Sequence, residues 1–189
     1  MRRLLVVFSV LLSSVVLSAQ EHPKYELFGG YSYLRGEGTN FNGWEASGAY
    51  NFNRWIGLKL DVDGHYHSDS SNSFIAFHSS QKVHDALVGP QFSWRAHRWT
   101  LFAHTLFGFS HASLHTRVDN APPPFPSPFI FDESHNDLGV ALGGGGDWNF
   151  GKRWAARVQA DYLQSSAPNF TKSDNFRFST GLVFRFGAH

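Results

Sequence analysis

The sequence predicts an all-β fold: an eight-stranded antiparallel up-and-down transmembrane β-barrel, preceded by a signal peptide. Three observations favour this fold. Successive segments alternate apolar and polar side chains, the connections between the segments alternate in length, and tryptophans gather beside the short connections. Aromatic residues form 16% of the 189-residue chain and glycine contributes 18 residues, a combination that favours strands over helices.

The first twenty residues have the parts of a secretory signal. Arg2 and Arg3 form a basic start, residues 4–17 form an apolar run interrupted only by serines, and Ala19 is a small residue at a cleavage position. The run is shorter than the roughly 20 residues that a spanning helix needs, so we expect cleavage rather than a membrane anchor. The predicted organisation is a signal peptide at residues 1–19, a short periplasmic segment at 20–24 and a barrel at 25–187.

Charge and cysteine content narrow the function classes. Removal of residues 1–19 takes away two arginines and no acid, which leaves 14 basic and 15 acidic residues. A nearly neutral chain lacks the basic surface of a nucleic-acid-binding protein. There is no cysteine, which excludes disulfides and thiolate metal sites.

Eight segments have the period-two alternation of strands, and clusters of Gly, Pro, Asn, Asp and Ser separate them. We expect strands at residues 25–35, 41–52, 55–67, 82–95, 99–114, 137–150, 154–164 and 175–186. The connections at 53–54, 96–97 and 151–152 are short, whereas 36–40, 68–81, 115–135 and 165–174 are predicted loops. Prolines crowd residues 121–129 of the longest loop, which predicts an extended tip.

Segment 55–67 has the clearest alternation. Its apolar face carries Ile56, Leu58, Leu60 and Val62, and its polar face carries Lys59, Asp61, Asp63 and His65. Such a row of charges cannot form a dry core face unless the charges are paired. The last segment repeats the pattern, with phenylalanines on one face and Arg177 and Arg185 on the other. Pro90 fits its segment less well, because proline removes a donor from the ladder.

The polar faces carry charges of both signs. The interior of an eight-stranded barrel is about wide enough for side chains to fill it. We therefore predict a lumen polar network formed by Glu26, Glu45, Lys59, Asp61, Asp63, Asp85, Arg95, Arg157, Asp161, Arg177 and Arg185.

Five of the six tryptophans lie beside the three short connections. Indole rings collect where lipid meets water, whereas a protein core would not place them selectively next to turns. We predict an interface girdle of Trp55, Trp94, Trp99, Trp148 and Trp154. Outer-membrane barrels have short periplasmic turns and longer external loops, so we expect both termini in the periplasm. The alternative is a secreted, soluble lipocalin-like barrel with inverted faces, in which Lys59, Asp61 and Asp63 would meet water.

The end of the chain, residues 179–186 (STGLVFRF), resembles the C-terminal sorting signal of Gram-negative outer-membrane proteins. Segments 25–35 (YELFGGYSYLR), 89–95 (GPQFSWR) and 106–111 (LFGFSH) are similar to the small OmpA-type outer-membrane β-barrel domain family. The resemblance covers about residues 25–186. It implies location in the cell outer membrane, insertion by the barrel-assembly machinery, and an assembly signal at Ser179, Gly181, Phe184 and Phe186.

This sequence departs from that family at two points. Residues 187–189 follow the aromatic residue that usually ends such proteins. OmpA itself continues into a peptidoglycan-binding domain, which has no counterpart here, so cell-wall anchoring is not implied.

Histidines are the first candidate for a site. There are eleven, and seven map to the predicted external half: His65, His67, His78, His84, His111, His115 and His135. A metal site needs three or four converging ligands, and nothing in the spacing forces convergence. We expect polar rim residues, with no metal and no cofactor.

An enzyme is a further alternative, because outer-membrane barrels that acylate or deacylate lipid A exist. Asp63, His65 and Asp85 could lie together at the barrel mouth, but the sequence fixes no nucleophile beside His65 and the deacylase-like His-x-Ser-Asn pattern is absent. We therefore expect no enzymatic activity.

A narrow pore is another alternative. Paired charges together with inward-pointing Phe28, Leu87 and Leu106 would fill the lumen, although glycines at positions 89, 108, 139, 143 and 145 leave some room. We expect very small single-channel currents.

The sequence thus predicts an integral outer-membrane protein with a structural or surface-interaction role. The expected partners are outer-membrane lipid and lipopolysaccharide, the barrel-assembly machinery and an extracellular ligand that the sequence does not define. We expect a monomer. The predicted contact surface is the proline-rich loop, either exposed or packed on the barrel rim, with Phe125, Phe129, Ile130 and Phe131.

Overall fold

A computed structural model describes residues 22–188 except 37–38, 73–75, 120–126 and 167–172. The predicted signal peptide at 1–19 therefore lies outside the described residues, as does Phe125. Eight strands make up the described fold: β1 (Pro23–Gly36), β2 (Thr39–Asn51), β3 (Ile56–Asn72), β4 (Ala76–Arg95), β5 (Trp99–Asp119), β6 (Phe129–Asn149), β7 (Trp154–Ser166) and β8 (Ser173–Ala188).

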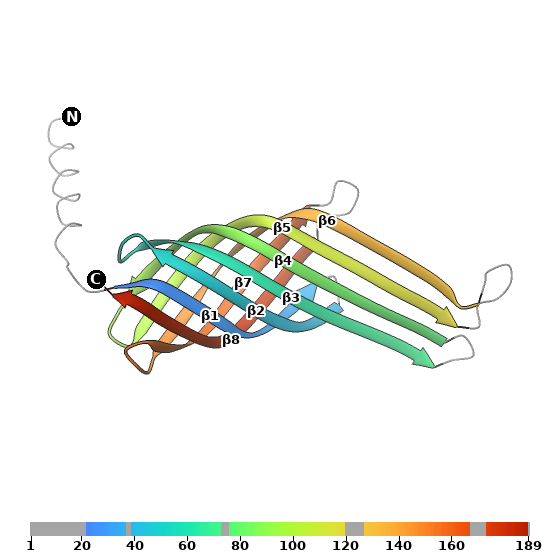
Figure 1. Cartoon of the computed structure of the whole chain (residues 1–189), viewed down its shortest axis with the longest axis horizontal. Coiled ribbons are helices and arrows are strands. Elements are labelled where there is room, and N and C mark those ends of the chain that lie inside the picture. Colours follow the sequence, from blue (N-terminus) through green and yellow to red (C-terminus); the bar gives the residue numbers. More distant parts are fainter. Residues whose placement is uncertain (1–21, 37–38, 73–75, 120–126, 167–172, 189) are drawn as a thin grey trace, which may run out of the picture.

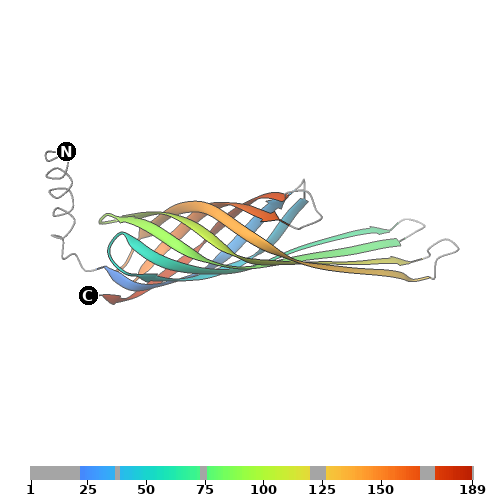
Figure 2. The same cartoon turned by 90° about the horizontal axis from the view of Figure 1, so that it is seen from above.

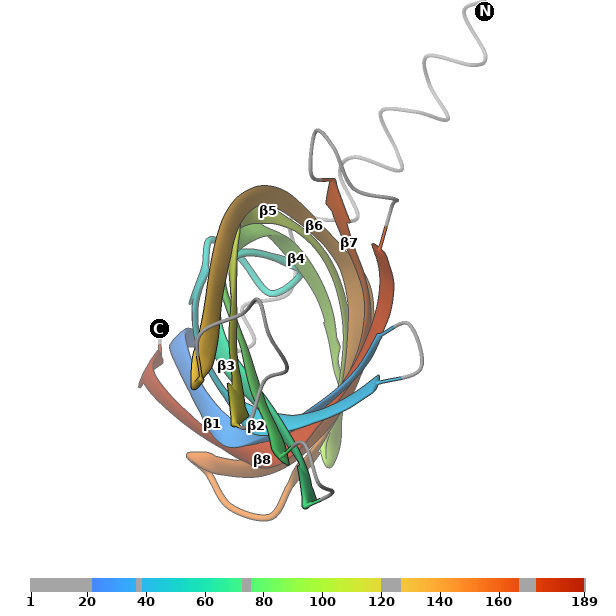
Figure 3. The ribbon, with the colours of Figure 1, turned by 90° about the vertical axis from the view of Figure 1, so that its right-hand side faces the viewer.

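The strands form one closed antiparallel barrel in chain order (Figure 1). Each strand pairs with its neighbours in the sequence, and β1 closes the ring against β8, with Tyr25 opposite Phe186. The end-on view shows the ring directly (Figure 3). This confirms the predicted fold class. Within the described ranges, no helix is long and apolar enough to cross a bilayer.

Side chains alternate between the lumen and the outside, as the period-two pattern requires. On β3, Leu58 and Leu60 are 44% and 55% exposed, whereas Lys59 and Asp61 between them are fully buried. The apolar face is therefore the outer face, and the charged face is the interior. A lipocalin-like barrel needs an apolar interior and a charged outer face, so the observed faces favour a membrane-spanning barrel.

The lumen is packed in layers. An apolar layer fills the half nearest the long connections, and Phe28 with Ala155 and Val183 forms a smaller cluster near the short turns. Charged residues fill the space between them. Phe28, Leu87 and Leu106 all point inward, as predicted. The larger apolar layer consists of Leu34, Phe41, Leu87, Leu106, Ala141 and Leu163.

The prediction of loops at 68–81 and 115–135 is wrong for most of these residues. β3 and β4 remain paired from Ile56 opposite Phe92 to Asn72 opposite Ala76, and β5 pairs with β6 as far as Val118 opposite Phe129. Four strands therefore continue beyond the ring as one sheet, which we call the external sheet (Figure 2). Both faces of this part lie in water, so its strands need no alternation of apolar and polar residues. The period-two pattern of the spanning part is therefore weak here.

The external sheet begins where the barrel opens. β2 pairs with β3 only as far as Tyr66, and β7 pairs with β6 only from Leu138. From Phe129 to Asp137, β6 extends about 26 Å along the strand at roughly 3.3 Å per residue.

The three short connections at the opposite end occupy residues 52–55, 96–98 and 150–153, slightly longer than predicted. β1 begins at Pro23, inside the predicted periplasmic segment at 20–24.

Pro90 lies within β4, between two strands rather than at an edge. Its register against β3 is continuous, with Leu58 opposite Pro90. The ladder to β5 is interrupted there: pairing stops at Val88 opposite Phe107 and resumes at Gln91 opposite His104. The missing proline donor is thus accommodated by a local gap on one side of the strand.

A charge on the outer face of β3 tests its lipid exposure. Leu60→Arg is expected to lower the free energy of unfolding in phospholipid vesicles by about 2–4 kcal/mol, because arginine near the middle of the bilayer is poorly solvated. The matched control is Ser70→Arg, an exposed position on the same face of β3 in the external sheet. Urea titration measures both, and an equal effect of the two substitutions would argue against lipid around Leu60.

Candidate functional site

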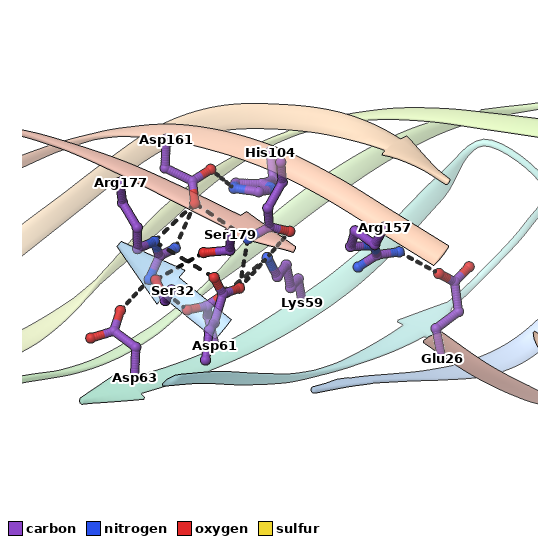
Figure 4. A network of polar contacts seen from close by, with 12 residues as sticks. Glu26, Ser32, Lys59, Asp61, Asp63, His104, Arg157, Asp161, Arg177 and Ser179 are labelled. Atoms are coloured by element: carbon purple, nitrogen blue, oxygen red, sulfur yellow. Dashed lines mark hydrogen bonds and ion pairs between the residues drawn. The ribbon is translucent and has the colours of Figure 1, made fainter. Parts of the chain in front are cut away.

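The eleven residues of the predicted lumen polar network all lie on the interior face. Ten of them are buried, and the side chain of Arg95, at the periplasmic end, is 13% exposed. Ten of the eleven form two groups along the barrel axis, and Asp85 on β4 stands opposite Asp63 of the central group in the β3–β4 ladder. The central group surrounds Arg177 (Figure 4). The second group surrounds Arg157 near the short turns, and Figure 4 shows its contact between Arg157 and Glu26. We call it the periplasmic group, because outer-membrane barrels have their short turns on the periplasmic side.

Arg177 on β8 is the centre of the larger group. Its guanidinium donates to Asp161 on β7 over 2.7 Å and to Asp61 on β3 over 3.0 Å, and it also contacts Asp63. Glu45 on β2 lies 3.8 Å from its Nε. One planar cation thus joins β2, β3, β7 and β8 across the lumen.

Lys59 supplies the second cation of the central group. Its Nζ lies 2.7 Å from Asp61 and 3.6 Å from Glu45. Gln159 links the same groups as a neutral bridge: its amide donates to Glu45 over 2.6 Å, and its carbonyl oxygen accepts from Lys59 over 3.4 Å.

The periplasmic group is built on Arg157. Its guanidinium donates to both oxygens of Asp147 over 2.7 and 2.9 Å and to Glu26 over 3.1 Å. The same guanidinium lies over the rings of Phe102 and Phe28, at 4.3 and 5.4 Å from their centroids. Ionic and aromatic contacts therefore fix Arg157 together.

Several members of this network were not predicted as such. Asp147 on β6 binds Arg157 and Arg185, and His104 on β5 binds Asp161 through Nε2 over 2.8 Å. Both stand on lumen-facing positions that alternation alone identifies. A Cβ at position 143 would lie 1.9 Å from a carboxylate oxygen of Asp161, so glycine at this position leaves room for the contact.

The central group contains an ordered serine, histidine and aspartate. Ser32 Oγ lies 2.9 Å from His65 Nε2, and His65 Nδ1 lies 3.1 Å from Asp63. Asp63 and His65 were predicted to lie close together, whereas Ser32 was not predicted beside them, because it stands on β1, distant in sequence. Ser32 and His65 are completely buried, and Ser32 also shares a hydrogen bond with Ser179. A hydrolase of this type must expose its serine to substrate, which this arrangement does not do.

The histidines of the external half do not gather. The rings of His78, His84, His111 and His115 lie on the outer face of the external sheet, and those of His67 and His135 lie on its inner face, the face continuous with the lumen. Among the described residues, no group of three or more His, Cys, Asp or Glu is arranged to hold a metal ion.

His67 stands just beyond the spanning part of β3. Its Nδ1 faces the carbonyl oxygen of Asn40 at 2.8 Å, and its Nε2 faces Asp69 at 3.0 Å. Both ring nitrogens face acceptors, so the doubly protonated ring is favoured, and the hydrogen bond to Asp69 raises the pKa of His67. This contact is therefore strongest below the ordinary histidine pKa and weakens as the pH rises through the raised value.

The inner face of the external sheet is apolar near its tip. Phe77 on β4, Val118 on β5 and Phe129 on β6 are directly opposite one another, and Phe131 follows on β6. Phe77 and Phe131 are 40% and 45% exposed. Ile130 is exposed on the other face. Three residues of the predicted contact surface thus belong to a paired strand, β6, rather than to a loop.

The predicted girdle residues lie at the turn end of the barrel. Trp94, Trp99, Trp148 and Trp154 are exposed on the outer face, and Trp55 is half-buried and stacked on Phe92.

The predicted assembly signal divides between the two faces of β8. Ser179 points into the lumen, and a Cβ on Gly181 would lie 2.3 Å from the carbonyl oxygen of Gly29. Phe186 stacks on Tyr25 of β1, with ring centroids 5.1 Å apart.

The family model of the outer membrane protein β-barrel domain matches residues 4–186. The chain belongs to this family. Membership confirms the resemblance to small outer-membrane barrels and places the protein in the outer membrane, in contact with its lipid. No curated protein matches the sequence.

Solved outer-membrane barrels have the same fold. Ail, the attachment invasion locus protein of Yersinia pestis, is 18% identical with a TM-score of 0.58, over 88% of this chain and 99% of Ail. Neisserial surface protein A is 10% identical with a TM-score of 0.51, over 86% and 96%. The outer membrane protease OmpT of Escherichia coli is 9% identical with a TM-score of 0.55, over 90% and 99%. At these identities the likeness establishes the fold alone.

Loss of the central cation should damage the barrel. Arg177→Met is expected to lower the free energy of unfolding by about 3–5 kcal/mol, because it leaves buried carboxylates without their partner. Arg117→Met is the matched control, because the side chain of Arg117 is 51% exposed in the external sheet. Urea titration in vesicles compares the two; similar, small effects would mean that the network does not stabilise the fold.

The buried serine should be unreactive. A fluorophosphonate probe, which labels accessible nucleophilic serines, is expected to label the folded barrel no more than the Ser32→Ala variant. Labelling that disappears on replacement of Ser32 would show that the serine–histidine–aspartate arrangement is open to substrate.

Proposed function

We propose that this protein is a surface-interaction barrel of the outer membrane, in which the lumen stabilises the fold and the external sheet binds a protein partner outside the cell. The observation that carries this proposal is the external sheet itself. Four strands continue past the last pairings with β2 and β7, and β6 runs about 26 Å along its length beyond that point.

The chemistry of the tip points to a protein partner. Phe77, Val118 and Phe131 lie on one face, and two of them are large side chains left substantially exposed. Contiguous exposed apolar groups on a protein surface typically mark interaction sites. Phe77 and Val118 stand on β4 and β5, which are paired on both sides, and Phe131 stands on the edge strand β6. The ordered ladder holds these side chains in place, which lowers the entropy cost of binding.

Comparison with Ail agrees with a surface role. Ail is named an attachment and invasion protein, and it has been solved with the heparin analogue sucrose octasulfate. The external sheet of the present chain offers a mixed charge to such a ligand: Lys82 and Arg117 on its outer face are accompanied by Asp119 and Asp132. The apolar patch is therefore the better candidate for contact.

The remaining functions are less well supported. A catalytic role needs an accessible nucleophile, and Ser32 is covered. A pore needs free space along the axis, and the layer around Leu87 and Leu106 occupies the lumen near the external end. We therefore propose a non-enzymatic protein with very small conductance. We further propose that it is a monomer and that the barrel-assembly machinery inserts it through the signal at Ser179–Phe186.

The apolar patch gives the direct test. Phe77→Asn with Phe131→Asn is expected to reduce binding of expressing cells to host or neighbouring cells on the order of tenfold, as expected for loss of two central aromatic anchors. The matched control is His78→Asn with Ile130→Asn, which changes exposed residues of the same two strands on the opposite face.

Surface amounts of all variants are equalised by antibody labelling of intact cells before binding is compared. Equal losses in the two double variants, or no loss in either, would contradict binding through the inner face.

A further inference from the structure

The periplasmic mouth of the barrel contains a pocket with a basic lining and a volume of about 560 Å³. Its floor consists of lumen-facing residues from four strands, and its walls come from two short turns, β4–β5 and β6–β7. Neutral donors line it as well, from Thr100 and Asn149. The ionisable residues of the lining are Arg95, His97, Lys152, Arg153 and Arg185.

Positive charge at this mouth exceeds the negative charge available to it. The nearest carboxylates, Glu26 and Asp147, lie deeper in the lumen and are shared among three guanidiniums. Glu26 accepts from Arg95 over 2.6 Å, and Arg157 binds both carboxylates. Arg185 also contacts Asp147. The floor therefore has one more cation than it has anions, and the turns add further cations.

The turns increase this excess. Lys152 and Arg153 stand on the β6–β7 turn, and both are exposed. Residues 22–25, 51–56, 95–100 and 149–154 include Lys24, Arg54 and Arg98 but contain neither aspartate nor glutamate. A concave site lined by charges of one sign concentrates its field and attracts counter-ions.

Two buried donors in the pocket floor lack an acceptor. Arg95 Nε and Arg185 Nε have no hydrogen-bond partner among the described residues, and Arg185 Nε lies 3.9 Å from a carboxylate oxygen of Glu26. A buried donor without a partner is costly, so these two atoms add to the unmatched positive charge beneath the mouth, although neither is open to an anion from outside. The terminal nitrogens of both guanidiniums already donate within the protein, those of Arg95 to Arg54 and Glu26 and those of Arg185 to Asn149 and Asp147. Lys152 and Arg153 on the turn are the exposed cations of the lining that can contact an anion directly.

We propose that the periplasmic mouth binds a water-borne phosphate-class anion. The pocket opens along the barrel axis, inside the ring of strands. The lipid-facing Trp94, Trp99 and Trp148 are not part of its lining, and among the described residues Phe186 of β8 is the one large outward-facing side chain that is. A phosphate that diffuses in the periplasm can reach this site directly, whereas a lipid headgroup would have to cross the rim.

Inorganic pyrophosphate is the probe for this site. The full barrel is reconstituted in phosphatidylcholine nanodiscs, and pyrophosphate is titrated by calorimetry at low and at moderate salt. Saturable binding is expected, and it should weaken with salt because the contacts are ionic. Lys152→Ser with Arg153→Ser should reduce affinity on the order of tenfold or more, because two cations leave the pocket wall.

Arg54→Ser with Arg98→Ser is the matched control. It removes the same charge from the same end of the barrel, but neither residue lines the pocket, and the Arg54 guanidinium lies over the Trp55 ring instead. Binding should be unchanged in this variant. Absence of saturable binding in the unmodified barrel, or equal weakening in both double variants, would overturn the proposal.

A second experiment distinguishes a water-borne phosphate from the phosphate of a lipid headgroup. Nanodiscs with a third of their lipid replaced by phosphatidylglycerol offer lipid phosphates at the rim. Unchanged pyrophosphate affinity in these discs supports a water-borne anion. Competition by phosphatidylglycerol that disappears in the Lys152→Ser, Arg153→Ser variant would overturn that assignment in favour of a lipid headgroup.

Discussion

Charge matching inside a narrow lumen is the constraint on which this structure depends. An eight-stranded ring leaves an interior that side chains alone can fill. Each charge placed there loses water and must find a partner. Arg177 meets this need for Asp61, Asp63 and Asp161, and Arg157 meets it for Glu26 and Asp147. Because these partners come from different strands, the ionic contacts also fix the strands relative to one another.

Because side chains fill the lumen, the two surfaces that we propose for binding lie at the ends of the barrel. At the external end, four strands remain paired after the ring has opened, and they hold Phe77 and Phe131 away from the membrane. At the periplasmic end, arginines that are only partly matched by Glu26 and Asp147 join the lysine and arginine of a turn. The same lumen therefore supports an apolar contact face on one side and a cationic pocket on the other.

The spanning part of the fold could be read from the sequence, because the bilayer imposes a strict pattern on it. Lipid on one side and a packed interior on the other require alternation, so the inward positions of Lys59, Arg157 and Arg177 followed directly. The external sheet could not be read in this way. At residues 68–72 and 76–81 both faces of the sheet meet water, and a polar paired strand resembles a polar loop in sequence.

Contacts between distant strands also could not be predicted from the sequence. The position of Ser32 beside His65 depends on how β1, β2 and β3 align: Ser32 stands opposite Gly43, and Gly43 stands opposite His65. Alternation assigns a residue to a face, but it does not say which partner that residue meets across a lumen. For the same reason Asp147 and His104 were recognisable as inward residues but not as partners of Arg157 and Asp161.

The most direct measurement of the central claim is the surroundings of β3 along its length. The chain contains no cysteine, so single cysteines at positions 58, 60 and 62, and at 68 and 70, can carry spin labels without a background. In vesicles, the first three labels should collide readily with oxygen, which concentrates in lipid, and rarely with a water-soluble nickel chelate. The labels at 68 and 70 should show the reverse. Ready access of the nickel chelate to positions 58, 60 and 62 would contradict a barrel surrounded by hydrocarbon and filled by ion pairs.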